Sequence, residues 1–177
     1  MSRPTPFVDD DFLAHKVEEA AVEIDPTLNF SHRALQRAKE YWQVRRANRA
    51  MPAREDLSTS DMRPFITHVT IVRVDGPADP ASEYTIRIAG AEVEKVFGPI
   101  SGKQLRSALP ADAAARWRYC YEMVRNERRP LRFCGHIRFQ DKRWLIGETF
   151  VAPLGGEKVT GLFGAFACWH DMAQKPR

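Results

Sequence analysis

The stretch that decides the fold is YTIRIAGAEVEKVFGPISGKQ, residues 84–104. Within residues 84–89, large apolar side chains alternate with other residues, and this alternation predicts a β-strand. Gly90 permits a sharp turn because it has no Cβ atom. Residues 91–97 then place apolar side chains at helical spacing, and the Gly98-Pro99 pair ends the helix. The stretch therefore predicts a strand, a glycine hinge, a short helix and a loop.

The residues on either side predict further helices and strands. Helices are expected over residues 12–24, over residues 31–50 with Ser31 as the cap, and over residues 111–128. Strands are expected over residues 66–74, 131–140, 144–153 and 159–169. Residues 75–80 are rich in turn formers and would join the first two strands as a long hairpin. The last three strands would form a meander.

Two phrases in this order resemble a known family. They are YWQVRRANRAMPAREDLSTSDMRPFITHVTIVRV, residues 41–74, and RIAGAEVEKVFG followed by SGKQL, within residues 87–105. Together they look like the stand-alone bacterial PAS-like family, formerly a domain of unknown function, over about residues 31–168. The resemblance implies an α+β fold, with a five-stranded antiparallel sheet, short helices on one face and an N-terminal helical extension.

The same patterns divide the chain into four segments. Residues 1–30 are expected to be a tail with a short helix, 31–50 an amphipathic helix, 51–170 the PAS-like domain and 171–177 a C-terminal tail. A chain of 177 residues with 44% hydrophobic residues is enough for one domain with an ordinary core. The net charge of +4 is mild and requires no polyanionic partner.

Targeting signals are not evident in the sequence. No apolar run approaches the roughly 18 residues that span a bilayer, and the acidic N-terminus lacks the apolar core of a signal peptide. The cysteines Cys120, Cys134 and Cys168 have no metal-binding or paired spacing. We therefore expect a cytoplasmic protein whose thiols are reduced and mostly fill the core.

A small-molecule site is expected between the sheet and the helices, as the resemblance implies for PAS cavities. Arg87 stands in mid-strand, where its guanidinium could anchor a ligand carboxylate or phosphate. The alternative is a structural ion pair with Glu94, Asp56 or Glu148. The aromatic residues expected to line the cavity are Phe97, Trp117, Phe133 and Phe150. A core filled by these rings, with no cavity, is the other possibility.

The helix over residues 31–50 is expected to carry the contact with other molecules. Its apolar stripe includes Leu35, Tyr41 and Trp42, with Trp42 as the central anchor. The helix would pack on the outer face of the sheet, or on its twin in a homodimer. Since the chain shows no kinase, cyclase or helix-turn-helix pattern, any signal would pass to a partner protein by contact. The sequence therefore indicates a non-catalytic sensory module.

Other kinds of site have weaker support. Cys134 and His136 share a strand face, but a zinc site needs three or four ligands, so no metal is expected. His68 or His136 could hold a haem, yet the resemblance supplies no ligand histidine, and neither haem nor flavin is expected.

An alternative is a small hydrolase or isomerase that uses Glu148 and His136 as an acid–base pair. A nucleic-acid interface would use the arginines within residues 33–49 and 116–132, and it is not expected. No membrane partner is expected.

Overall fold

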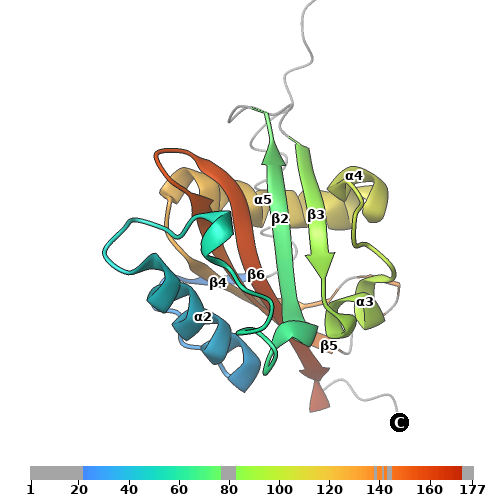
Figure 1. Cartoon of the computed structure of the whole chain (residues 1–177). Coiled ribbons are helices and arrows are strands. Elements are labelled where there is room, and N and C mark those ends of the chain that lie inside the picture. Colours follow the sequence, from blue (N-terminus) through green and yellow to red (C-terminus); the bar gives the residue numbers. More distant parts are fainter. Residues whose placement is uncertain (1–21, 77–82, 138, 141, 143–144, 173–177) are drawn as a thin grey trace, which may run out of the picture.

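The computed structural model describes residues 22–76, 83–137, 139–140, 142 and 145–172. Figure 1 shows the strands and helices of these residues. The strands are β1 (Glu23–Asp25), β2 (Val69–Asp75), β3 (Glu83–Ala89), β4 (Leu131–His136), β5 (Leu145–Gly155) and β6 (Val159–His170). The α-helices are α2 (Arg33–Arg46), α3 (Ala91–Phe97), α4 (Leu105–Ala108) and α5 (Ala111–Glu127), and the 3-10 helices are η1 (Arg54–Asp56) and η2 (Ile66–His68).

The six described strands form one antiparallel sheet in the order β1-β4-β5-β6-β2-β3. Five of them are the strands predicted from the sequence, and α3 and α5 lie between β3 and β4 in the chain, as predicted, with the short helix α4 between them. The sixth, β1, was not predicted: Ile24 pairs with Phe133 of β4, although the sequence pattern suggested a helix ending there. The rest of that expected helix, residues 12–21, lies outside the described residues, as do residues 77–82 of the expected hairpin.

The junction between β3 and α3 shows why a glycine occupies position 90. Its φ of −71° is open to any residue, so the turn itself does not require glycine. A Cβ atom at Gly90 would instead stand 2.2 Å from the carbonyl oxygen of Thr67, which no side chain can tolerate. Gly98 ends α3 with a φ of +81°, a conformation that favours glycine.

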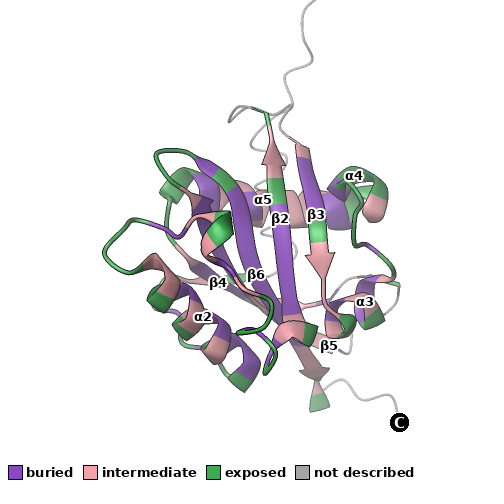
Figure 2. Cartoon of the chain, viewed as in Figure 1, coloured by how far each residue is buried: buried purple, intermediate pink, exposed green. Residues whose placement is uncertain are grey.

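Helices cover both faces of the sheet. In Figure 1, α2 lies in front of the sheet and α5 behind it, and Figure 2 shows the central strands buried between them. On the α2 side, the indole Nε1 of Trp42 donates a hydrogen bond to the Pro153 carbonyl of β5 at 3.0 Å. The amphipathic helix therefore packs on the outer face of the sheet, which was the first of the two arrangements expected for it.

Several element boundaries differ from those predicted. The residue that caps α2 is His32 rather than Ser31, because the His32 Nδ1 atom accepts the Ala34 N–H at 3.2 Å. The strand expected from residue 66 begins at Val69, after the 3-10 turn η2. β4 ends at His136, four residues earlier than expected. None of the helices in the described part of the chain is both long and apolar enough to cross a membrane.

Candidate ligand cavity and its link to helix α2

Strand β5 separates a cavity from the α2 side of the sheet. Its side chains alternate between the two faces. Thr149 and Val151 line a cavity beneath α5, whereas Glu148 and Phe150 point to the opposite face, where α2 and the segment before it pack. One strand therefore contacts both the interior space and the docked helix.

The inner chamber of the cavity has a volume of about 80 Å³ and is mostly apolar. Its described walls come from β2, α3, α5, β4, β5 and β6. The lining residues are Thr70, Phe97, Trp117, Cys120, Tyr121, Phe133, Thr149, Val151 and Phe166. Space is therefore left between sheet and helices, rather than a core filled by these rings.

An outer chamber of about 110 Å³ adjoins the inner one and shares six of its lining residues. The shared residues are Phe97, Trp117, Cys120, Phe133, Thr149 and Phe166. The outer chamber extends towards the end of β4 and adds more polar groups, among them Arg116, Cys134 and His136. The two chambers together thus have an apolar end and a more polar end.

Phe97 stands at the centre of an aromatic cluster between the chambers. Its ring centroid lies 4.8 Å from that of Trp117 and 5.3 Å from that of Phe166, both nearly edge-to-face. The ring of Phe139 lies 5.5 Å from it. Such pairs prefer offset or edge-on geometry, so an additional planar ring would find suitable neighbours here.

The helix α5 presents one face to the cavity. Ala113, Arg116, Trp117 and Cys120 follow helical spacing on this face and line the outer chamber. Burial raises the pKa of the Cys120 thiol to about 12, while the charge of Arg116 acts in the opposite direction. The thiol is therefore protonated at neutral pH.

On the opposite face, a buried carboxylate holds the beginning of α2. Glu148 is fully buried, and its two oxygens accept the backbone N–H groups of Ser31 and His32, each at 2.9 Å. The Arg132 Nε atom donates to Glu148 Oε1 at 2.7 Å. These contacts satisfy a charge that would otherwise be costly to bury, and they fix α2 to strands β4 and β5.

The predicted ligand residues divide between the two faces. Phe97, Trp117 and Phe133 come together around both chambers. Phe150 was assigned to the wrong face: its ring packs against Phe30 at 5.4 Å and Phe163 at 6.1 Å, on the α2 side.

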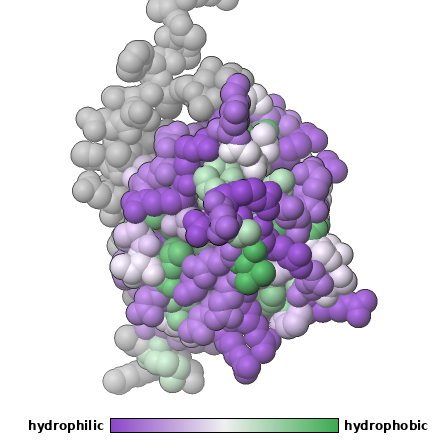
Figure 3. Space-filling model, turned by 60° about the vertical axis from the view of Figure 1, so that its left-hand side comes forward, coloured by the Kyte–Doolittle hydropathy of each residue, from purple (hydrophilic) through white to green (hydrophobic). Residues whose placement is uncertain are grey.

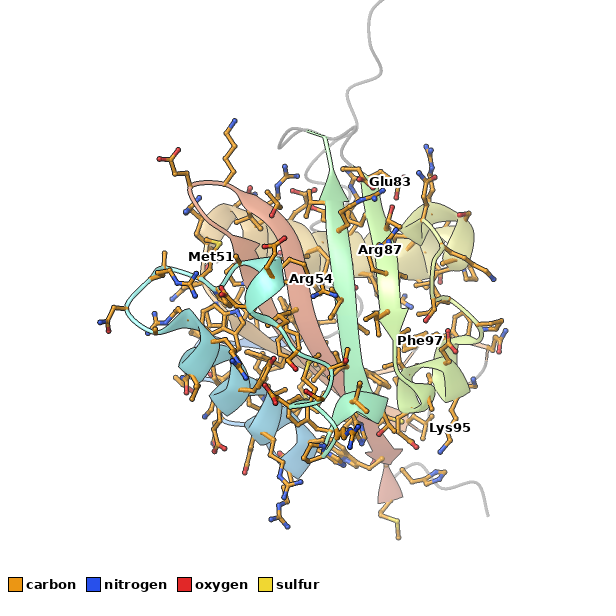
Figure 4. All side chains as sticks on the ribbon, viewed as in Figure 1. Met51, Arg54, Glu83, Arg87, Lys95 and Phe97 are labelled. Carbon is orange, nitrogen blue, oxygen red and sulfur yellow. The ribbon has the colours of Figure 1, made fainter. Side chains whose placement is uncertain are left out.

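Arg87, predicted in mid-strand as a ligand anchor or a structural ion-pair residue, is exposed. It lies on β3 at the edge of the sheet, on a different element from Phe97 (Figure 4). Because Arg87 is exposed to solvent, its guanidinium needs no buried partner. Glu148 pairs with Arg132 and not with Arg87.

The residues predicted to contact a partner are largely covered by the chain's own sheet. Leu35 is 0% exposed and Trp42 is 2% exposed. Tyr41 is partly buried, and its ring lies 5.8 Å from that of Phe65 and 5.9 Å from that of Phe163. Leu35 and Trp42 could meet another molecule only if α2 left the sheet.

The structure does not bring together the residues of the alternative sites. Glu148 holds the backbone N–H groups before α2, whereas His136 Nε2 contacts Asp171 Oδ2 at 2.8 Å. The suggested acid–base pair is therefore not assembled. No group of three or more potential metal ligands occurs among the described residues. Among the arginines of the suggested nucleic-acid surface, several form ion pairs with acids.

Sequence reasoning missed two parts of the site. The burial of Glu148 was readable from its position on an apolar strand face, but its role at the start of α2 was not, because its partners lie more than 100 residues away. The place of Cys120 on the cavity wall was also missed. Its spacing from Trp117 on α5 was the available signal.

Comparison with known proteins gives one match. The family model of the PAS domain matches residues 30–167, which includes α2 and the whole described part of the cavity lining except Val22. Neither the curated proteins nor the solved structures give a match. The matched region covers most of the 177 residues. The chain therefore belongs to the PAS domain family.

Proposed function

We propose that this chain is a non-catalytic sensory or regulatory module that binds a small molecule in the two chambers and signals to another protein through α2. The observation that carries the proposal is the alternation along β5. Thr149 and Val151 line the inner chamber, while Glu148 holds the backbone N–H groups that precede α2. Any ligand that shifts this strand also shifts the anchor of the helix.

The signal would be a change in how often α2 is docked. A ligand can shift such an equilibrium only if it binds the docked and undocked states with different affinity. The chambers lie between β5 and α5, so an occupant that presses on Thr149 or Val151 acts on the same backbone that carries Glu148. Weaker contact of Glu148 with Ser31 and His32 would favour release of α2.

Partner contact would use the outward side of α2 when the helix is docked. This side is mostly hydrophilic, with small hydrophobic patches, in the view that brings it forward (Figure 3). Its exposed residues are Arg33, Gln36, Glu40, Gln43 and Val44. Val44 is 75% exposed, which makes it the natural apolar contact point for a partner protein or a second copy of the chain.

The ligand part is tested by native mass spectrometry of the freshly purified protein, together with its visible spectrum. We expect the folded protein to carry a small non-covalent compound in part of the population. Loss of this extra mass on mild denaturation would confirm that the fold retains the compound.

The coupling part is tested by hydrogen exchange of the amides in residues 33–46. Val151→Ala removes side-chain contacts on the cavity side of β5 and should raise exchange in α2. Leu105→Ala is the matched control, since Leu105 is similarly buried on α4, a helix that packs mainly on α5 and β3. Equal protection of α2 in both variants would contradict coupling through β5.

The partner part is tested by light scattering after size-exclusion chromatography. A homodimer formed through the outward side of α2 should become monomeric in Val44→Glu, which introduces a charge at an exposed apolar contact. A wild-type protein that is monomeric at high micromolar concentration would exclude the homodimer and leave a different protein as the partner.

A further inference from the structure

Two buried tyrosines lie next to each other, and they differ in what their hydroxyls bond. Tyr84 is 0% exposed and Tyr121 is 5% exposed, and their ring centroids are 5.3 Å apart. The Tyr84 hydroxyl donates to Glu122 Oε1 at 2.6 Å. Within the described part of the chain, the Tyr121 hydroxyl has no hydrogen-bond partner. Because buried tyrosine hydroxyls usually have one, Tyr121 retains an unused capacity to bond a ligand.

The Tyr121 hydroxyl belongs to the interior of the protein. Tyr121 lines the inner chamber together with Trp117, whose ring centroid lies 6.2 Å from its own. Burial raises the pKa of the Tyr121 hydroxyl, so it is protonated at neutral pH. A protonated hydroxyl can donate one hydrogen bond and accept another. The wall of the inner chamber therefore offers a neutral group that serves either role.

The sheet places a second hydroxyl on the same chamber. Gly164 of β6 pairs with Val151 on one side and with Thr70 on the other. A Cβ atom at Gly164 would stand 2.3 Å from Thr70 Oγ1, so the Thr70 hydroxyl occupies the space that a side chain at position 164 would need. Since Val151 and Thr70 both line the inner chamber, this hydroxyl lies on the cavity face of the sheet.

The described walls of the inner chamber carry no charge. None of its lining residues is a lysine, arginine, histidine, aspartate or glutamate. Burial raises the pKa of the Cys120 thiol to about 12, which leaves the thiol neutral as well. An ion would lose its hydration here without gaining an opposite charge. The inner chamber therefore favours an uncharged ligand.

The size and shape of the space point to a compact, planar ligand. The chambers measure about 80 and 110 Å³, whereas drug-sized ligands occupy pockets of roughly 300 Å³ or more. An apolar cavity of about 150 Å³ is known to hold benzene. The ring of Phe97 meets those of Trp117 and Phe166 edge-on in this space, which suits one further planar ring.

We propose that the inner chamber selects a small uncharged phenol, with its ring among Phe97, Trp117 and Phe166 and its hydroxyl bonded to that of Tyr121. A phenolic hydroxyl can accept a hydrogen bond from Tyr121 and donate one to Thr70 Oγ1. This inference rests on the proposed function, since it names the chemical class of the molecule that the cavity binds.

The experiment uses the full chain at neutral pH and three probes: phenol, toluene and benzoate. Phenol and toluene differ only by a hydroxyl in place of a methyl group, and benzoate adds a charge. Binding is followed by NMR through the indole N–H signals of Trp117, which lines both chambers, and of Trp42, which lies on the opposite face. We expect saturable shifts of the Trp117 signal and little change at Trp42. The hydrogen bond to Tyr121 predicts that phenol binds about tenfold more tightly than toluene.

The variant Tyr121→Phe removes only the hydroxyl and should abolish the preference for phenol over toluene. It should leave the urea midpoint of the ligand-free protein unchanged or raise it, because no hydrogen bond is lost. Tyr84→Phe is the matched control, since Tyr84 lines neither chamber and its hydroxyl is bonded to Glu122. It should lower the urea midpoint and keep the preference for phenol.

Each other outcome contradicts a particular step. Toluene binding as tightly as phenol would overturn the choice of a phenol while leaving a ligand-binding cavity in place, and benzoate binding more tightly would overturn the choice of an uncharged ligand. A preference for phenol that survives Tyr121→Phe would overturn the role of Tyr121, as would a fall in the urea midpoint equal to that of Tyr84→Phe. Failure of all three probes to shift Trp117 would overturn the aromatic class, and a retained compound in native mass spectrometry would then still support the proposed function.

Discussion

The two faces of the sheet differ in how completely they are filled. On the α2 face, Trp42, Phe150 and Phe163 are almost completely buried, and Glu148 has hydrogen-bond partners for both oxygens. On the α5 face, rings of similar size leave chambers of about 80 and 110 Å³. In a close-packed region, a small change in side-chain volume alters stability, whereas a region with unfilled space tolerates such a change. The α2 face therefore defines one helix position, and the α5 face can accept an occupant.

The sharpest test of this difference truncates one tryptophan on each face. Trp42→Ala should reduce the free energy of unfolding by about 3–5 kcal/mol, because a fully buried ring and its bond to Pro153 are lost. Trp117→Ala should cost less, about 1–3 kcal/mol, since Trp117 is partly exposed and already borders a cavity. Urea denaturation of both variants gives the two values. Equal losses would mean that the faces are packed equally well.

The second test removes the carboxylate that anchors α2. Glu148→Ala should cost about 3 kcal/mol or more, because Arg132 stays buried without its main partner and two backbone N–H groups lose their acceptor. Glu157→Ala is the matched control in the exposed β5–β6 turn and should change the free energy of unfolding by less than about 0.5 kcal/mol. Urea denaturation measures both. A small loss for Glu148→Ala would show that α2 docks without this anchor.

The third test adds volume on opposite sides of β5. Val151→Ile extends a side chain into the inner chamber and should change the free energy of unfolding by no more than about 0.5 kcal/mol. Ala152→Leu adds atoms at a fully buried position that is paired with Phe163, and overpacking should cost about 1–3 kcal/mol. Thermal unfolding of the two variants compares them directly. A larger loss for Val151→Ile would show that the chamber does not accommodate added atoms.

The sequence predicted the α5 side of this comparison better than the α2 side. Period-two alternation and helical spacing are local, and they located β3, α3 and α5 and brought Phe97, Trp117 and Phe133 to the cavity. The position of Phe150 depended on which face of β5 turns towards α5, and alternation alone does not settle that choice. Arg87 was misplaced for a related reason: whether a strand lies at the edge of the sheet is a property of the whole topology.

The features that the sequence did not predict depend mostly on contacts between residues far apart in the chain. Glu148 meets Ser31 and His32 across more than 100 residues, and the strand β1 exists because it pairs with β4. Three residues are too few to show a period, so the added edge strand had no sequence signal. The predicted cap of α2 was wrong by one residue: Ser31 was expected because serine is a common cap, whereas His32 caps the helix.

The smallest expected effect is a loss of stability at acid pH that depends on His32, the residue that caps α2. Burial and the charge of His68, whose ring centroid lies 5.0 Å away, hold the pKa of His32 below its usual value of 6.5, although Glu148 and Glu92 act against this. The unprotonated Nδ1 atom of His32 accepts the Ala34 N–H. The unfolded chain therefore binds the proton more readily, and stability should be complete above about pH 6.5 and fall as the pH drops towards the folded pKa.

The matched variant is His32→Asn, because asparagine is a good cap and does not titrate. It should retain most of the stability at pH 7.5 and lose part of the decline seen in the wild type below pH 6.5. His170→Asn, at an exposed position on β6, should keep that decline. Urea denaturation at several pH values between 5 and 8 measures the slopes. An unchanged slope in His32→Asn would place the acid sensitivity elsewhere, and the α2 face would then owe its fixed helix position to packing and Glu148 alone.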